Sequence, residues 1–432
     1  MKKIIAALAF LAVLDSCSNK TKPVVDIVFT DSLLTHHSRS LAQNLNEQNL
    51  IFWKNKLDKS PRGYVEMQQY AGTLAGRFHL SGDINDLKRA DSILRWLNTE
   101  FKGKDAGIVR ALAVHAITQH RFAEASDLVQ QALAIGSEKY ISELLNFDAA
   151  FELGNVQLAQ DILKSVKSSN EYGYFFRLSK YDHLEGELDS SIAAMNKAAE
   201  LAGNSISLRQ TALSNTADLY MHAAYAKHAN ELYMRSIKLD ASDLHSIMGI
   251  GWLALVHDKN DELAERIFKF VQTQTQSPEV LLKLAQVAEQ RGDSIAEKKY
   301  ADEFVLAVSD TLYGNMYNKY LVDLYSNFLH EPAKAVSIAE RELMNRLTPQ
   351  TYSWYVWSLF KNGQPDKALQ FYDKYVSGKP LEGLELYYMG KMMQALDKGY
   401  NAEQYFKVAY KNRYDLSPAK AKDLEEIMND PH

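Results

Sequence analysis

The chain is poor in the residues that crosslink or interrupt helices. It has one cysteine, Cys17, in 432 residues, so no internal disulfide can form and packing has to stabilise the fold. Proline (9) and glycine (20) are scarce, which favours a mostly helical chain. No Pro/Gly/Ser-rich linker divides the interior, although a chain of this length usually splits into domains. A repeat array accounts for this, because its core grows along one direction.

Long apolar runs are also missing. A membrane-spanning helix needs about 20 apolar residues, and the run at residues 4–14 is shorter than that. It follows Lys2 and Lys3, and this order is typical of a secretory signal peptide, which we place at residues 1–16. The rest of the chain offers no run that could span a bilayer. We therefore expect an exported protein whose remainder lies outside the membrane.

The lone cysteine lies directly after this leader. The sequence Leu14-Asp15-Ser16-Cys17 resembles the lipobox of bacterial lipoproteins, although Asp15 departs from the usual small or apolar residue. The resemblance implies that Cys17 is acylated and anchors the protein in a membrane, with residues 17–30 as a flexible tether. Ser18 is not the acidic residue that retains lipoproteins in the inner membrane. The resemblance thus favours the outer membrane, facing the periplasm.

The charge of the chain is balanced. Removal of residues 1–16 takes away two lysines and one aspartate, which changes the formal net charge from −5 to −6. No block of like charge stands out. A mildly acidic chain of this kind argues against nucleic acid as the main partner.

Small and large apolar residues recur with a regular period. In the clearest copy, Ala217 and Ala229 are small contact positions, while Tyr220 and Tyr233 fill the space one turn away. Equivalent anchor positions recur with a mean spacing of 35 residues over the nine intervals from Leu87 to Ala402. The anchors are Leu87, Ala125, Ala159, Ser191, Ala229, Ala264, Ala296, Ala335, Ala368 and Ala402. Such a period indicates stacked helix pairs.

Residues 63–415 therefore resemble the tetratricopeptide repeat family. The resemblance implies an all-α fold, a right-handed α-α superhelix of about ten helix pairs whose first helices line a concave face. Residues 31–62, with one long helix from about residue 31 to 57, would cap the first repeat. Residues 416–432 would cap the last. The alternative is an all-α solenoid or bundle without true repeats.

Chemical motifs are absent or isolated. His36 and His37 diverge on a helix, His115 and His120 are poorly spaced, and no second cysteine exists, so we expect no metal site and no cofactor. Ser-x-x-Lys occurs twice, at residues 358–361 and 417–420, without the partner motifs of serine enzymes. The Gly-x-Gly at residues 249–251 follows no strand. We expect no catalytic residues and no enzyme activity.

The expected binding surface is the concave face. Tyrosine and tryptophan cluster on the expected first helices, and some rings should reach this groove, although most should be core. The inward-facing positions of the central first helices are Phe176, Lys180, His183, Asp218 and Met221. The predicted function is a membrane-tethered scaffold for protein or peptide partners. Binding of carbohydrate or peptidoglycan by exposed aromatics is the first alternative, and a hidden enzyme is the second.

Overall fold

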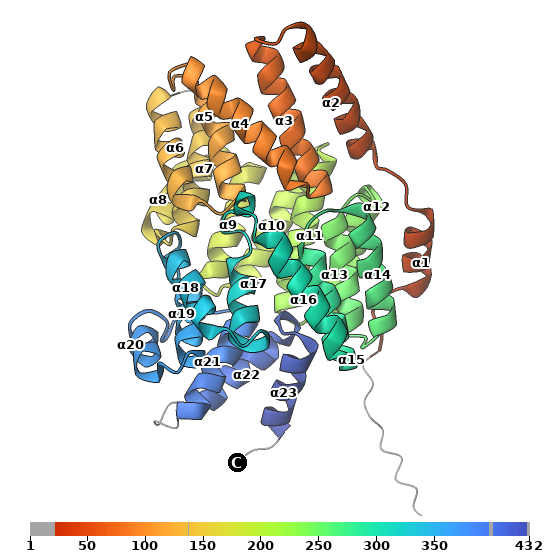
Figure 1. The fold of residues 1–432 in the computed structure, drawn as a ribbon, viewed down its shortest axis with the longest axis vertical. Helices are drawn as coiled ribbons and strands as arrows, with labels where there is room; N and C mark the ends of the chain where they lie inside the picture. The colour runs from red at the N-terminus through yellow and green to blue at the C-terminus, as the bar shows by residue number, and fades with distance from the viewer. Residues whose placement is uncertain (1–21, 137, 397–400, 430–432) are drawn as a thin grey trace, which may run out of the picture.

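The computed structural model describes residues 22–136, 138–396 and 401–429, and within these ranges the secondary structure is helical, with no strand (Figure 1). None of the helices in these ranges combines the length and the apolarity that crossing a membrane requires. The helices are α1 Ile27–His36, α2 Leu41–Lys59, α3 Tyr64–Ser81, α4 Ile84–Glu100, α5 Ala106–Thr118, α6 Phe122–Ile135, α7 Lys139–Glu152, α8 Val156–Val166, α9 Tyr172–Leu184, α10 Leu188–Leu201, α11 Ile206–His222, α12 Ala226–Leu239, α13 Leu244–Val256, α14 Asp261–Gln274, α15 Glu279–Arg291, α16 Ser294–Val308, α17 Asn318–Asp323, α18 Pro332–Leu343, α19 Pro349–Lys361, α20 Pro365–Tyr375, α21 Gly383–Leu396, α22 Ala402–Lys411 and α23 Pro418–Asn429. Short η1 Lys167–Ser169, η2 Thr311–Tyr313, η3 Leu324–Phe328 and η4 Arg413–Asp415 link them.

Successive helices pack as pairs, from α3 with α4 to α21 with α22. Each predicted anchor lies on the second helix of its pair, and eight of the ten have no exposed surface. Ala296 and Ala402 are the exceptions and are half-buried, because they are the third and the first residue of their helices, whereas each of the other anchors is the fourth. The predicted all-α solenoid of tetratricopeptide-like helix pairs is thus confirmed.

Glycines form several of the turns between paired helices. Gly82, Gly154, Gly292 and Gly363 all have positive φ, the conformation that ends a helix without steric cost for glycine. Asp83, Asn155 and Asp293 then cap the next helix by accepting a backbone hydrogen bond.

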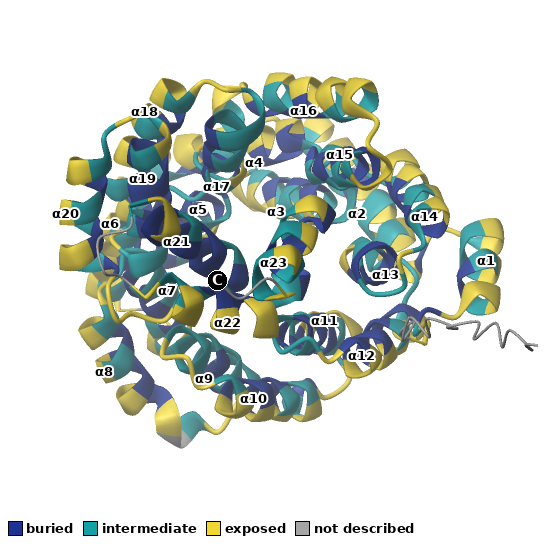
Figure 2. Cartoon of the chain, turned by 90° about the horizontal axis from the view of Figure 1, so that it is seen from below, coloured by how far each residue is buried: buried dark blue, intermediate teal, exposed yellow. Residues whose placement is uncertain are grey.

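The superhelix closes on itself after one turn (Figure 2). Backbone hydrogen bonds join distant repeats: Gln276 N donates to Ser81 O at 2.7 Å, Asn315 N to Gln119 O at 3.0 Å, and Leu347 N to Leu153 O at 3.3 Å. An apolar cluster covers the same contact, with Phe78, Ile84, Leu87, Leu282, Phe304, Val308, Tyr313 and Tyr317. We call this contact, between the α3–α8 repeats and the α15–α18 segment, the turn-to-turn interface.

The C-terminal segment folds back across the interior of the ring, where α22 and α23 lie in Figure 2. Trp252 Nε1 donates to Tyr414 O at 2.8 Å, and Asn412 Nδ2 donates to His222 O at 2.7 Å. Ser417 Oγ donates to Glu289 at 3.1 Å, which joins the start of α23 to α15. The predicted C-terminal helix therefore contacts α15 as well as α22.

The N-terminal segment differs from the prediction of one long helix. It forms two helices, α1 and α2, because Ser40 caps α2 in a reciprocal box with Gln43. The residues before α1 also lie against the solenoid: Val24 N and Val25 N donate to the two carboxylate oxygens of Asp258 at 2.9 and 3.0 Å. The part of the predicted tether that the structure describes, residues 22–30, is therefore bound to the outer side of α12 and α14.

We expect Asp258→Ala to release the N-terminal segment. The Asp258 side chain is 4% exposed and accepts two backbone hydrogen bonds, so its loss should lower the free energy of unfolding by about 2 kcal/mol. Amide hydrogen exchange in α1 should become faster. The control is Asp31→Ala, which removes an exposed ion pair with Arg266. This substitution should lower the free energy of unfolding by about 0.5 kcal/mol or less. Unchanged exchange in α1 of Asp258→Ala would contradict this assignment.

Candidate functional site

Cavities lie between the helices of the described part of the chain. The largest of these that lies among the predicted binding residues has a volume of about 560 Å³, and we call it the central cavity. It is lined by α7, α9 and α11 on one side and by the segments around α18–α19, α21 and η4 on the other. Its polar lining consists of Glu152, Lys180, His183, His222, Arg346, Thr348, Gln350, Lys379, Glu382, Asn412 and Asp415.

One end of the central cavity carries an ion-pair cluster. Glu152, at the end of α7, lies 3.2 Å from Lys180 Nζ of α9 and 2.8 Å from Arg346 Nη2. Burial alone would raise the pKa of Glu152, but the charges of Lys180 and Arg346 outweigh it and lower that pKa. The cluster therefore holds a carboxylate between two cations, one from α9 and one from the segment between α18 and α19.

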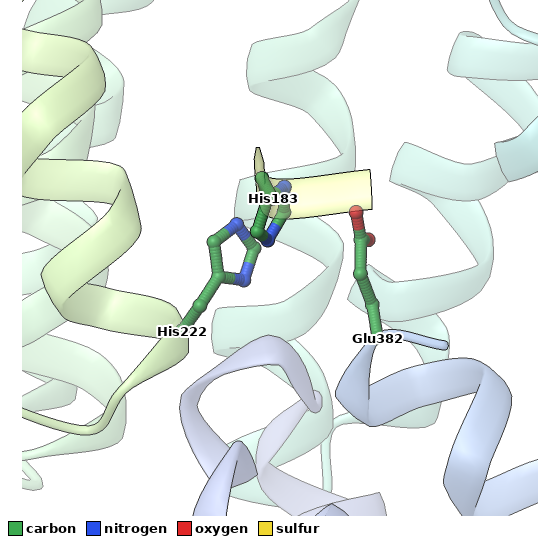
Figure 3. Close-up of side chains that lie close together, drawn as sticks. All are labelled: His183, His222 and Glu382. Atoms are coloured by element: carbon green, nitrogen blue, oxygen red, sulfur yellow. The ribbon is translucent and has the colours of Figure 1, made fainter. Parts of the chain in front are cut away.

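The middle of the cavity brings two histidines and a glutamate together (Figure 3). His183 lies in the last turn of α9, His222 ends α11, and Glu382 precedes α21. The two imidazole rings stack with centroids 5.0 Å apart, and the Glu382 carboxylate points toward them. His222 Nδ1 donates to Asp415 Oδ1 at 2.8 Å. Burial opposes the charge of His222, yet Asp415 and Glu382 together raise the pKa of this imidazole to about 10.

Lys319 of α17 closes the network on the far side of Glu382. Its ammonium lies 3.2 Å from Glu382 and 3.1 Å from Glu385. Glu385 is 1% exposed and also accepts from Trp354 Nε1 at 2.8 Å. Burial would raise the pKa of Glu382, but Lys319 and the two histidines lower it to about 2.

A second cavity, of about 370 Å³, lies between α15, α17, α21 and α23, and we call it the C-terminal cavity. Asp323 accepts from the hydroxyl of Tyr388 and lies 3.6 Å from Lys420. Glu297 borders the same cavity. Burial and the neighbouring Glu289 carboxylate raise the pKa of Glu297 to about 7.

The raised pKa of Glu297 predicts a pH-dependent stability. A carboxyl group that holds its proton more tightly in the folded protein stabilises the fold below pH 4.5, and this contribution is lost as the pH rises to about 7. Glu297→Gln should therefore raise the melting temperature at pH 8 and leave it nearly unchanged at pH 4. The matched control is Glu303→Gln on the same helix, whose side chain is 45% exposed. An equal change in melting temperature at both pH values would contradict this prediction.

The five predicted binding residues do not form one site. Lys180 and His183 line the central cavity, whereas Asp218 lines a third cavity of about 530 Å³ and lies 2.8 Å from His245 Nε2. Phe176 is half-buried and stacks on Tyr172. Met221 is 5% exposed and belongs to the core, so its predicted place on the inner surface is wrong: it packs between α11 and the next pair.

Most of the aromatic residues on the first helices belong to the core, as the sequence analysis predicts. Trp357 and Tyr388 are 6% exposed each and stack on one another with centroids 4.4 Å apart. Tyr320, which is 37% exposed and borders the C-terminal cavity, does reach the interior. Charged and polar side chains therefore make up most of the lining of the central cavity, whereas Tyr320, Trp357, Tyr387 and Tyr388 border the C-terminal cavity.

The sequence did not point to Arg346, Glu382 and Asp415 of the central cavity, or to Lys319, which pairs with Glu382. They lie in later repeats, more than a hundred residues from His183, and reach the cavity only because the superhelix closes and η4 folds inward. No local spacing connects them. His222 has only His228 near it in the sequence, and His228 lies across a turn on α12.

Several solved structures are similar to the chain. They include pilF of Pseudomonas aeruginosa (12% identity over 50% of this chain and 98% of the other, TM-score 0.36). A tetratricopeptide repeat protein from Parabacteroides merdae has 15% identity over 67% of this chain and 99% of the other, with a TM-score of 0.34. The human IFIT1 dimer with m7Gppp-AAAA has 11% identity over 75% and 76%, with a TM-score of 0.48. These values describe a distant likeness of fold. No protein-family model and no curated protein matches the chain.

Proposed function

We propose that this protein is an exported scaffold, anchored by lipid at Cys17 in the outer membrane, that binds a protein or peptide partner inside its closed turn without catalysing a reaction. The observation that carries the proposal is the polar lining of the interior. The central cavity offers both signs of charge within one concavity, from Glu152, Lys180, Arg346 and Glu382. A peptide carries both signs of charge together with backbone donors and acceptors, so it can complement such a surface.

The lining supports a peptide partner over a carbohydrate. A sugar site needs aromatic faces that are free to stack on the ring. The tryptophans of α19 instead make these contacts with other residues of the chain. Trp357 stacks on Tyr388, and Trp354 Nε1 donates a hydrogen bond to Glu385. Within the described residues, Tyr320 is the one aromatic residue of the predicted first-helix clusters whose exposed fraction is greater than a third. The carbohydrate alternative therefore has little support in the central cavity, and the aromatic residues Tyr320, Trp357, Tyr387 and Tyr388 border the C-terminal cavity instead.

The contact of the N-terminal segment supports a defined orientation of the anchored protein. Cys17 precedes Lys22 by five Cα steps, which can extend over at most about 18 Å. Val24 and Val25 are bound to Asp258, beside α14. An acyl group on Cys17 would therefore hold the α12–α14 side of the ring toward the membrane. The interior would remain accessible from the periplasm.

Site-specific photo-crosslinking in intact cells tests the proposal. A photoreactive residue at Lys180 or Lys379, both on the central cavity, should yield an adduct with a protein partner. The control positions are Lys164 on α8 and Lys197 on α10, whose side chains are 64% and 45% exposed on second helices. Adducts from the control positions alone would contradict binding inside the ring. Globomycin should make a larger precursor accumulate, and a chain of unchanged size would contradict the lipid anchor.

A further inference from the structure

We infer that His183, His222 and Glu382 form a binding site for one divalent transition-metal ion, with zinc as the favoured metal. Each residue offers one donor atom, and the three donor atoms lie within 4.8 Å of one another. Two imidazoles and one carboxylate are a ligand set that suits zinc and related metals. The inference does not depend on the proposed scaffold function, and it departs from the sequence-based prediction that the chain has no metal site.

The donor atoms lie near enough to hold one ion after a modest movement of the side chains. Tetrahedral ligands at about 2.1 Å from zinc lie about 3.4 Å from one another, so a pair of donor atoms at the largest separation, 4.8 Å, has to close by about 1.4 Å. All three are half-buried rather than enclosed in the core, which leaves room for that movement. Figure 3 shows that they come from three separate segments and point toward a common centre.

A second, independent observation is the support behind His222. Asp415 accepts from His222 Nδ1 at 2.8 Å, so Nε2 is the ring nitrogen that can bind a metal once its proton is displaced. Because the pKa of this imidazole is raised to about 10, the ion competes with a proton, and binding should weaken as the pH falls. Metal-binding histidines commonly donate their second ring nitrogen to a carboxylate in this way, and the bond fixes the tautomer and the ring orientation.

Asp415 also joins two of the segments that carry the ligands. Its second oxygen accepts from Gly383 N at 3.0 Å, next to Glu382. Asn412 Nδ2 donates to His222 O at 2.7 Å, which fixes the end of α11 against the same segment. The backbone around the site is thus held in place before any ion binds.

The site is open on one side. Three protein ligands leave a fourth position of a tetrahedral ion free, and the central cavity of about 560 Å³ lies beside it. Water or a side chain of a partner could occupy that position. Lys319 lies 3.2 Å from one oxygen of Glu382, so the second oxygen is the one that would bind the ion. The nearby ammonium opposes a cation, and we expect weaker binding than at a closed structural zinc site.

Isothermal titration of the untagged mature chain carrying Cys17→Ser with Zn²⁺ tests the inference. We expect one ion per chain. His183→Ala, His222→Ala and Glu382→Gln should each weaken binding at least ten-fold, and Asp415→Asn should weaken it by about ten-fold through the orientation of His222. His245→Ala is the matched control, because His245 also pairs with an aspartate, Asp218, but faces another cavity, and it should bind zinc like the parent chain.

Circular dichroism without metal verifies that each variant is folded. If a variant does not fold, the Co²⁺ complex of the parent chain decides: a tetrahedral absorption spectrum in the visible range that zinc displaces supports the site. Absence of Zn²⁺ binding by the parent chain, or binding that survives the His183→Ala/His222→Ala double substitution, would overturn the inference.

Discussion

Gly154→Ala is expected to open the closed turn and to lower the free energy of unfolding by about 3 kcal/mol. Gly154 has φ +81°, where alanine is strained by about 1 kcal/mol. A Cβ at this position would lie 2.5 Å from the carbonyl oxygen of Leu347, a backbone atom of the opposite side of the turn-to-turn interface. The two sides would have to separate, which would break the bond from Leu347 N to Leu153 O and the Arg346–Glu152 ion pair. Chemical denaturation and small-angle X-ray scattering measure the two effects.

Gly363→Ala is the control that separates strain from contact. Gly363 also ends a helix with positive φ, +71°, but a Cβ there would meet no atom within 4 Å. Gly363→Ala should therefore lower the free energy of unfolding by about 1 kcal/mol and leave the radius of gyration unchanged. If Gly154→Ala and Gly363→Ala have equal effects, the turn-to-turn interface does not hold the superhelix closed.

Lys319→Met is expected to destabilise the protein by about 3 kcal/mol, because it leaves buried carboxylates without their cation. Lys319 lies 3.1 Å from Glu385, which is 1% exposed, and 3.2 Å from Glu382. Methionine matches the length of the lysine stem, so loss of charge dominates over loss of packing. Urea denaturation of the parent and the variant measures the change.

A double substitution identifies the origin of this loss. Glu385→Gln removes the charge that Lys319 neutralises and keeps an oxygen that can accept from Trp354 Nε1. The variant Lys319→Met/Glu385→Gln should therefore be more stable than Lys319→Met alone. If the two substitutions are simply additive, Lys319 and Glu385 do not interact energetically.

The repeat architecture could be predicted because its determinants are local. Small anchors such as Ala229 recur with the period of one helix pair, and residues such as Gly82 and Asp83 end one helix and begin the next. One local signal was missed: Ser40 and Gln43 form a Ser-x-x-Gln capping box, which marks the start of α2 and separates it from α1.

The closed turn and the central cavity could not be predicted in this way. Closure depends on small rotations that accumulate over many helix pairs, and no single repeat encodes their sum. His183, His222 and Glu382 belong to three different pairs and meet only in the closed ring. The prediction that aromatic rings reach the groove fails at Trp357 and Tyr388 for a related reason. These rings stack on one another between adjacent first helices, and charged residues line the central cavity.

A distance measurement across the turn-to-turn interface tests the closed turn most directly. In a chain with Cys17→Ser, cysteines at the exposed positions Gln157 and Met344 would be the only thiols, so spin labels attach at these two sites alone. Both positions lie within about one helical turn of the Leu347–Leu153 contact. Double electron–electron resonance should then give a distance on the order of 20 Å. An open solenoid would place four helix pairs, and so five steps from pair to pair, between the labels. A distance of about 50 Å would therefore contradict the closed ring and the cavity that depends on it.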